Sequence, residues 1–153
     1  MRRAIFIGLL CATLLVGGAP AARASDDSVR AVVKTQADRQ IKEDKKFEKA
    51  LKKLKTKAQF KKARTATKTQ RASIETFKQA LAAERADSAK VKTGRRQMLD
   101  ALNLYDRGLN KLHTALTQAI DAGGASGEAK ARSAIKNMAT AVRRVRSAAK
   151  QIG

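Results

Sequence analysis

The feature that most constrains the fold is the spacing of apolar residues in the last third of the chain. Large apolar side chains recur there at steps of four and three residues, in a first run of Met98, Leu102, Tyr105, Leu109, Leu112, Leu116 and Ile120. A second run has the same kind of steps and consists of Ile135, Met138, Val142, Val145, Ala149 and Ile152. This spacing places each run on one face of an α-helix.

A short glycine-rich segment separates the two runs. It has the sequence Asp121-Ala122-Gly123-Gly124-Ala125-Ser126-Gly127. The glycines are suited to end one helix, and the serine is suited to cap the next. Because the connection is short, we expect two antiparallel helices that pack side by side as a C-terminal hairpin.

The N-terminal half has a less regular apolar pattern. One ragged run consists of Val33, Ala37, Ile41, Phe47, Leu51, Leu54 and Ala58, and a shorter one of Ile74, Phe77 and Leu81. Between them, residues 63–71 are polar and offer no large side chain to bury. We interpret this segment as a bend, a break or a helix that projects from the body. Thr93-Gly94 is a second expected boundary, since glycine costs about 1 kcal/mol inside a helix.

These patterns predict an all-α fold, namely a three- or four-helix antiparallel bundle with a long lysine-rich N-terminal helix and a firm C-terminal helical hairpin. The expected helices span about 28–64, 68–91, 95–121 and 126–151. No segment shows the alternation of apolar and polar residues that is typical of a strand.

The first 24 residues have the organisation of a secretory signal peptide. Two arginines precede the uncharged apolar run 4–16, and Ala22 and Ala24 supply the small residues before a cleavage site at Ser25. As a helix this run is about 20 Å long, which is short for a bilayer core of about 30 Å. We therefore expect cleavage after Ala24, a single helical domain of residues 25–153, and a secreted or extracytoplasmic location in the periplasm or cell wall.

The residues that common catalytic and metal sites require are scarce. The expected mature chain has no cysteine, and His113 is the single histidine. A zinc site needs several protein ligands, and a nucleophilic serine needs a base and a strand–turn–helix setting. We expect no enzymatic activity, no cofactor and no bound metal, and we interpret His113 as a partly covered residue beside the apolar stripe.

Phe60 does not follow the spacing of the apolar run that ends at Ala58, and its neighbours in sequence include Lys57, Lys61 and Lys62. One interpretation is an exposed group that stacks on bases or inserts into a membrane, although a contact with the core is the more common role. A single aromatic residue is not a base-stacking platform.

Basic residues are concentrated in two blocks without acids. Residues 49–74 contain ten basic residues and no acidic one, and residues 129–153 contain seven and none, whereas residues 75–128 contain eight and seven. The expected mature chain keeps 31 basic and 13 acidic residues, a net charge of +18. Such blocks produce a surface potential that holds polyanions, while a merely solvated basic surface remains the alternative.

The candidate polyanion-binding residues are Lys49, Lys52, Lys53, Lys55, Lys57, Lys61, Lys62, Arg64, Lys68, Arg71, Arg143, Arg144 and Arg146. Export favours anionic envelope polymers or lipid headgroups as partners, so we predict a non-enzymatic exported protein that associates electrostatically with the cell envelope or with membrane surfaces. Two alternatives stay open. One is a self-associating or partner-assembling coiled-coil-like structural protein, and the other is a protein that binds nucleic acid without sequence specificity.

Overall fold

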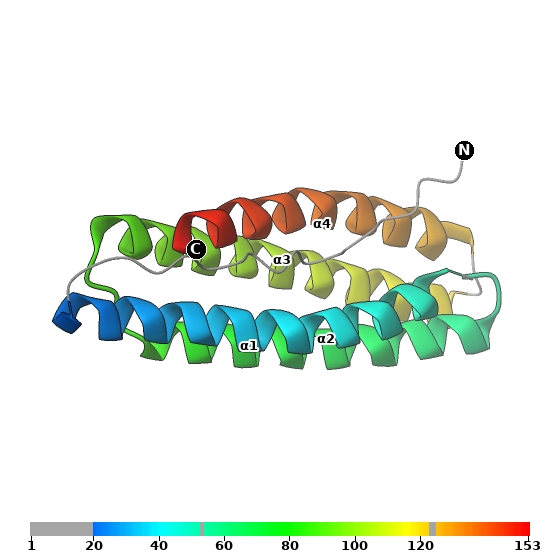
Figure 1. The fold of residues 1–153 in the computed structure, drawn as a ribbon. Helices are drawn as coiled ribbons and strands as arrows, with labels where there is room; N and C mark the ends of the chain where they lie inside the picture. The colour runs from blue at the N-terminus through cyan, green and yellow to red at the C-terminus, as the bar shows by residue number, and fades with distance from the viewer. Residues whose placement is uncertain (1–19, 53, 123–124) are drawn as a thin grey trace.

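The computed structural model describes the backbone of residues 20–52, 54–122 and 125–153, with side chains at 25–52, 54–122 and 128–153. These residues form four helices and no strand: α1 (Pro20–Leu51), α2 (Lys57–Ala83), α3 (Ala89–Asp121) and α4 (Ala125–Ile152). The helices run side by side in alternating directions (Figure 1). The predicted all-α antiparallel bundle is therefore confirmed, with four helices.

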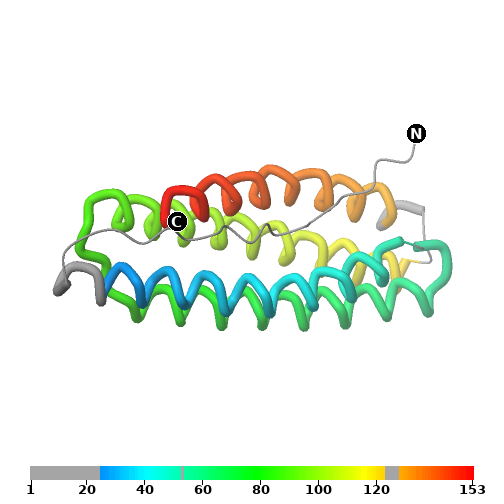
Figure 2. The backbone as a smooth tube through the Cα atoms, in the orientation of Figure 1, coloured from blue at the N-terminus to red at the C-terminus, as the bar shows by residue number. Residues whose placement is uncertain are grey.

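The helices pack mainly against their neighbours in sequence. α3 and α4 share the most extensive contact, α2 lies between α3 and α1, and α1 touches α3 and α4 at few points. Figure 2 shows this order, with α4 along α3 and α1 along α2. The C-terminal hairpin that the sequence predicted is thus the closest helix pair.

The predicted signal peptide lies largely outside the described residues, which begin at residue 20. Ala22 and Ala24 of the predicted cleavage site are described only as backbone in the first turns of α1. Signal-peptide cleavage therefore stays a prediction.

α1 ends at Leu51 and α2 begins at Lys57, so the prediction of a break near residues 64–68 was wrong. Thr56 Oγ1 accepts a hydrogen bond from the backbone N–H of Gln59 at 3.3 Å, and Gln59 Oε1 accepts one from the N–H of Thr56 at 3.1 Å. This reciprocal capping box satisfies two amides at the start of a helix. It therefore starts α2 at Lys57.

Residues 63–71 lie inside α2, so their interpretation as a bend, a break or a projecting helix was also wrong. The buried residues of α2 continue at steps of three and four along the helix: Phe60, Ala63, Thr67, Gln70, Ile74, Phe77 and Leu81. Small or polar side chains fill this seam where large ones are missing. Thr67 Oγ1 donates to the carbonyl oxygen of Ala63 at 2.8 Å, which satisfies the buried hydroxyl.

The boundary expected at Thr93-Gly94 was wrong as well, because α3 runs through both residues. A Cβ atom on Gly94 would lie 2.8 Å from Ile152 Cγ1 and 3.2 Å from the backbone nitrogen of Ile152. A Cβ atom on Gly108 would collide with Met138. Both glycines therefore allow α3 and α4 to approach closely, which outweighs their poor helix propensity.

Every member of the predicted stripe on α3 is buried. On α4, Met138, Val145 and Ile152 are buried, but the other three members of the predicted stripe are only partly buried, namely Ile135, Val142 and Ala149. Four alanines are also buried on this helix: Ala131, Ala134, Ala141 and Ala148. The buried seam of α4 thus combines small residues with larger ones, and two of the larger side chains, Met138 and Ile152, lie against the glycines of α3.

Residues in the first turns of α1 form hydrogen bonds to the start of α3 and to the end of α4, at one end of the bundle. Asp26 Oδ1 accepts hydrogen bonds from the backbone N–H groups of Asp87 at 2.9 Å and Ser88 at 3.2 Å, just before α3. Arg30 Nε donates to the carbonyl oxygen of Ile152 at 3.0 Å, at the end of α4. An anion at a helix N-terminus and a cation at a C-terminus are both favourable positions.

Candidate polyanion-binding surface

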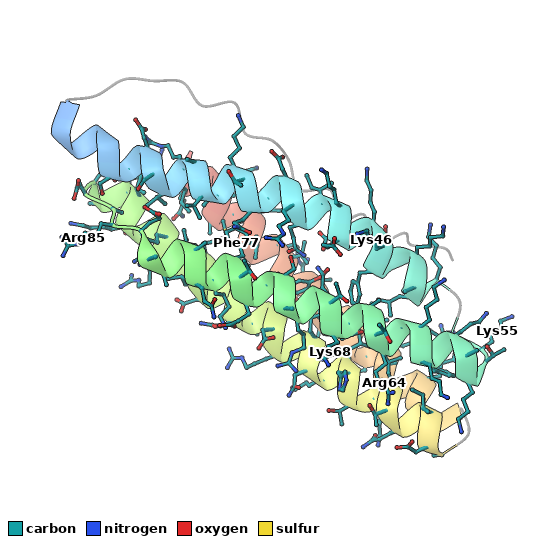
Figure 3. All side chains as sticks on the ribbon, turned by 90° about the horizontal axis from the view of Figure 1, so that it is seen from below. Lys46, Lys55, Arg64, Lys68, Phe77 and Arg85 are labelled. Atoms are coloured by element: carbon teal, nitrogen blue, oxygen red, sulfur yellow. The ribbon has the colours of Figure 1, made fainter. Side chains whose placement is uncertain are left out.

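Five basic residues form a row along one side of α2. They follow one another at steps of four and three residues, which keeps them on one helix face: Lys57, Lys61, Arg64, Lys68 and Arg71. The row is about 20 Å long at the rise of an α-helix. Figure 3 shows Arg64 and Lys68 along the boundary between α2 and α3. We call these five residues the α2 basic row.

Arg71 fixes how the row lies against α3. Its Nε donates to Asp106 Oδ1 at 3.0 Å, and its Nη1 donates to Asn110 Oδ1 at 3.0 Å. Because α2 and α3 are antiparallel, the earlier turns of α2 lie opposite later turns of α3. Arg64 and Lys68 are therefore level with His113.

The electrostatics of His113 confirm this placement. Partial burial and the positive charges of Arg64, Arg71 and Lys68 together lower the pKa of His113 from its ordinary value of 6.5. The imidazole therefore lies in a region of positive potential, which disfavours its protonation.

Most of the row lacks an acidic partner. Arg71 pairs with Asp106, but no ion pair in the described part of the chain involves Lys57, Lys61, Arg64 or Lys68. On the facing helix, no acid occurs in sequence between Asp106 and Asp121. Four cations therefore remain available to an external anion.

The other candidate lysines lie around the same end of the bundle. Lys49 and Lys52 are exposed at the end of α1, Lys55 is exposed in the connection (Figure 3), and Lys62 is exposed on another side of α2. Lys53 is outside the described residues. These lysines extend the positive potential of the row.

The α4 arginines do not join this surface. Gly94 faces Ile152 and Gly108 faces Met138, so Arg143, Arg144 and Arg146 lie level with α3 residues between those glycines. His113 and the unpaired cations of the row lie beyond Gly108. Arg143 Nη2 donates to Thr140 Oγ1 at 3.2 Å, and the charge of Arg146 acts on the buried Asp44 of α1. The second basic block is therefore a separate feature.

Phe60 belongs to the core. It is 2% exposed and begins the buried seam of α2. The interpretation as an exposed stacking or membrane-inserting group is therefore wrong. The signal was present in the sequence, since counting in sevens from Phe60 leads to Thr67, Ile74 and Leu81.

A buried polar cluster joins α1, α2 and α3, and it was not predicted from the sequence. Asp44 Oδ1 accepts hydrogen bonds from Gln40 Nε2 at 2.9 Å and from Gln70 Nε2. Gln70 Nε2 also lies 3.5 Å from the Tyr105 hydroxyl oxygen. Burial raises the pKa of Asp44, although the two amides and Arg146 oppose the rise. The carboxyl group thus couples protonation to the packing of α1.

Within residues 20–52, 54–122 and 125–153, no three His, Cys, Asp or Glu side chains gather into a set of metal ligands. None of the helices described there combines the length and apolar character needed to cross a membrane. Comparisons with family models, curated proteins and solved structures gave no match.

Proposed function

We propose that this chain is a non-enzymatic, exported polyanion-binding protein that associates electrostatically with anionic polymers or membrane surfaces of the cell envelope. The observation that carries the proposal is the α2 basic row together with the exposed lysines beside it. Four cations of the row have no acidic partner among the described residues. Unpaired cations close together repel one another, and a polyanion relieves that repulsion while releasing its own counterions.

Export is part of the proposal because of the signal-peptide pattern at residues 1–24. In an extracytoplasmic compartment, the abundant polyanions are envelope polymers and lipid headgroups. Attraction to either falls off within about 10 Å at 0.1 M salt. Binding should therefore weaken steeply as salt rises.

The test compares two charge-matched quadruple variants with the parent chain. One changes Lys52, Lys57, Lys61 and Lys62 to glutamine, all exposed near the row. The control changes Lys34, Lys42, Lys136 and Lys150, which are exposed on α1 and α4. Glutamine keeps good helix propensity, so helicity should be equal in all three proteins.

Binding is measured to phosphatidylglycerol vesicles, to phosphatidylcholine vesicles and to a soluble anionic polymer, at low and physiological salt. We expect binding to the anionic probes only, lost with salt and lost more in the first variant than in the control. Binding that is indifferent to salt, or no binding to any anionic probe, would reject the proposed function.

A further inference from the structure

The α2 basic row lies along the boundary between α2 and α3, which we call the valley. This position bears on which polyanion can contact the row. Arg71 reaches across to Asp106 and Asn110 of α3, so the row lies beside the boundary between the two helices. The outward ridge of α2 is exposed and carries one charge, that of Lys62, together with Ala58, Thr65, Thr69, Ala72 and Thr76. Most of the charge of this part of α2 therefore follows the valley, which the five cations of the row border.

The threonines of that ridge are already occupied by their own helix. The hydroxyl groups of Thr65, Thr69 and Thr76 each donate to the carbonyl oxygen four residues earlier, at 3.2, 3.3 and 3.0 Å. A flat lipid surface that touched the ridge would meet the single charge of Lys62 and no free hydroxyl donor from these three threonines. Phe60, the aromatic residue among these lysines, is buried and does not reach such a surface.

We infer that the valley between α2 and α3 is a binding site for a flexible single-stranded phosphodiester polymer, whose phosphates contact Lys61, Arg64 and Lys68, with His113 as a proton-dependent contact. This inference rests on the proposed function and names the site, the ligand chemistry and the regulation.

The spacing of the row suits such a chain. Steps of three and four residues along a helix advance about 5–6 Å, so cations recur regularly over about 20 Å. A phosphodiester strand carries one charge per repeat, and lysine binds phosphate as a point charge without requiring a fixed geometry. Arg71, held by Asp106 and Asn110, ends the run of unpaired cations.

His113 makes the site sensitive to pH. The charged groups that act on it are Arg64, Lys68 and Arg71 of α2, and Asp106 of its own helix is paired with Arg71. Among the described residues, no charged group of α1 or α4 contributes to this environment. A bound phosphate offsets the three cations and favours the imidazolium form. Binding therefore takes up a proton, and affinity rises as pH falls through the pKa of His113.

The test uses Lys61→Gln/Lys68→Gln and the matched control Lys136→Gln/Lys150→Gln, all at exposed positions. The probes are a synthetic poly(glycerol phosphate) oligomer and a single-stranded oligonucleotide with the same number of phosphates. At about 0.1 M salt, each lost contact to a single strand lowers affinity about 5-fold, so the first variant should bind about 20-fold more weakly. The control should change by less than about 2-fold, because its sites lie on α4, which does not contact α2 among the described residues.

Proton linkage is read from the chain's single histidine by NMR. Addition of the oligomer should raise the pKa of His113, and His113→Gln should remove the pH dependence of binding while keeping its salt dependence. An unchanged His113 pKa at saturation would overturn the site, as would oligonucleotide binding more than about 10-fold tighter than oligomer binding, since this site reads phosphates alone.

Two failures are distinguishable. If both double variants lose affinity equally, or if only vesicles bind, the valley is not the site but the proposed electrostatic function survives. If the parent chain binds no anionic probe at all, both the site and the function are rejected.

Discussion

The α3–α4 pair and α1 are held in the bundle by different kinds of contact. α3 buries thirteen residues, none of them charged, and two glycines bring it close to α4. α1 buries three apolar side chains among its described ones and an equal number of polar ones: Val29, Phe47, Ala50, Asp26, Gln40 and Asp44. The α3–α4 interface therefore depends on shape and apolar area, whereas the attachment of α1 depends on hydrogen bonds and on protonation.

The polar contacts of α1 are located at two levels of the bundle. Asp26 and Arg30 hold its first turns, and Asp44 holds it further along through Gln70 of α2. Residues 30–39 between them include no buried side chain. Conditions that change protonation should therefore loosen α1 before they affect α3 and α4.

The largest expected effect is in the α3–α4 region. Leu112 is fully buried, and Leu112→Ala should destabilise the protein by about 2–5 kcal/mol through lost apolar contact and the cavity that remains. Ile41→Ala on α1, where the side chain is only partly buried, should cost less than about 1.5 kcal/mol. Urea denaturation measures both, and equal costs would remove the contrast between the two regions.

The close approach of α3 and α4 can be tested by adding a methyl group at Gly94. Gly94→Ala should cost about 1–3 kcal/mol, although alanine is the better helix former by about 1 kcal/mol. The reason is the stiff Ile152 side chain and backbone that the new methyl group would meet. A stabilising Gly94→Ala, seen as a higher denaturation midpoint, would show that the helices can separate freely.

Gly108→Ala is its partner test, because the atoms it would meet belong to the side chain of Met138. Met138→Ala removes those atoms. The double variant should therefore be less destabilised than the sum of the two single changes. Simple additivity would mean that the side chains do not meet.

The apolar stripe of α3 and the hairpin could be predicted from periodicity. Large apolar residues at steps of three and four lie on a single face of a helix, so that face is the one that must be buried. The same reasoning failed on α2, where Ala63, Thr67 and Gln70 hold the inward positions. A search for large residues cannot find a seam made of small and polar ones. The Thr56–Gln59 capping box was the available signal for the helix start.

For the candidate site, the sequence identified the residues but not their arrangement. Residues 49–74 stood out by charge alone, yet the start of α2 at Lys57 decides which lysines share a helix face. The contacts of Arg71 with α3, and the position of Arg146 near Asp44, depend on tertiary packing between distant segments. Arg71 and Lys68 carry the same charge in the sequence, but in the structure Arg71 forms an ion pair with Asp106 and Lys68 has none among the described residues.

The buried carboxyl group of Asp44 allows a test of how protonation affects the attachment of α1. Burial raises its pKa above 3.8, so the stability it contributes is complete below that value and is lost as pH rises through the folded-state pKa. Asp44→Asn removes this titration. The free energy of unfolding of the variant relative to the parent should therefore increase from about pH 4 to pH 7, by about 1.4 kcal/mol for each unit of displacement. A constant difference across this range would contradict the account of Asp44.

Asp26 should respond to pH in the opposite sense and by a smaller amount. Burial opposes its ionisation, but hydrogen bonds from the Ser88 side chain and from the N–H groups of Asp87 and Ser88 hold the pKa of Asp26 below 3.8. Its contribution is therefore present above that pH and is lost as pH falls through the folded-state value. Asp26→Asn weakens an anionic cap at α3 and should cost about 1 kcal/mol at pH 7. The cost should be smaller at about pH 3 than at pH 7, as measured by urea denaturation. An equal cost at the two pH values would mean that the Asp26 side chain holds α1 by packing, and the polar account of α1 would then rest on Asp44 alone.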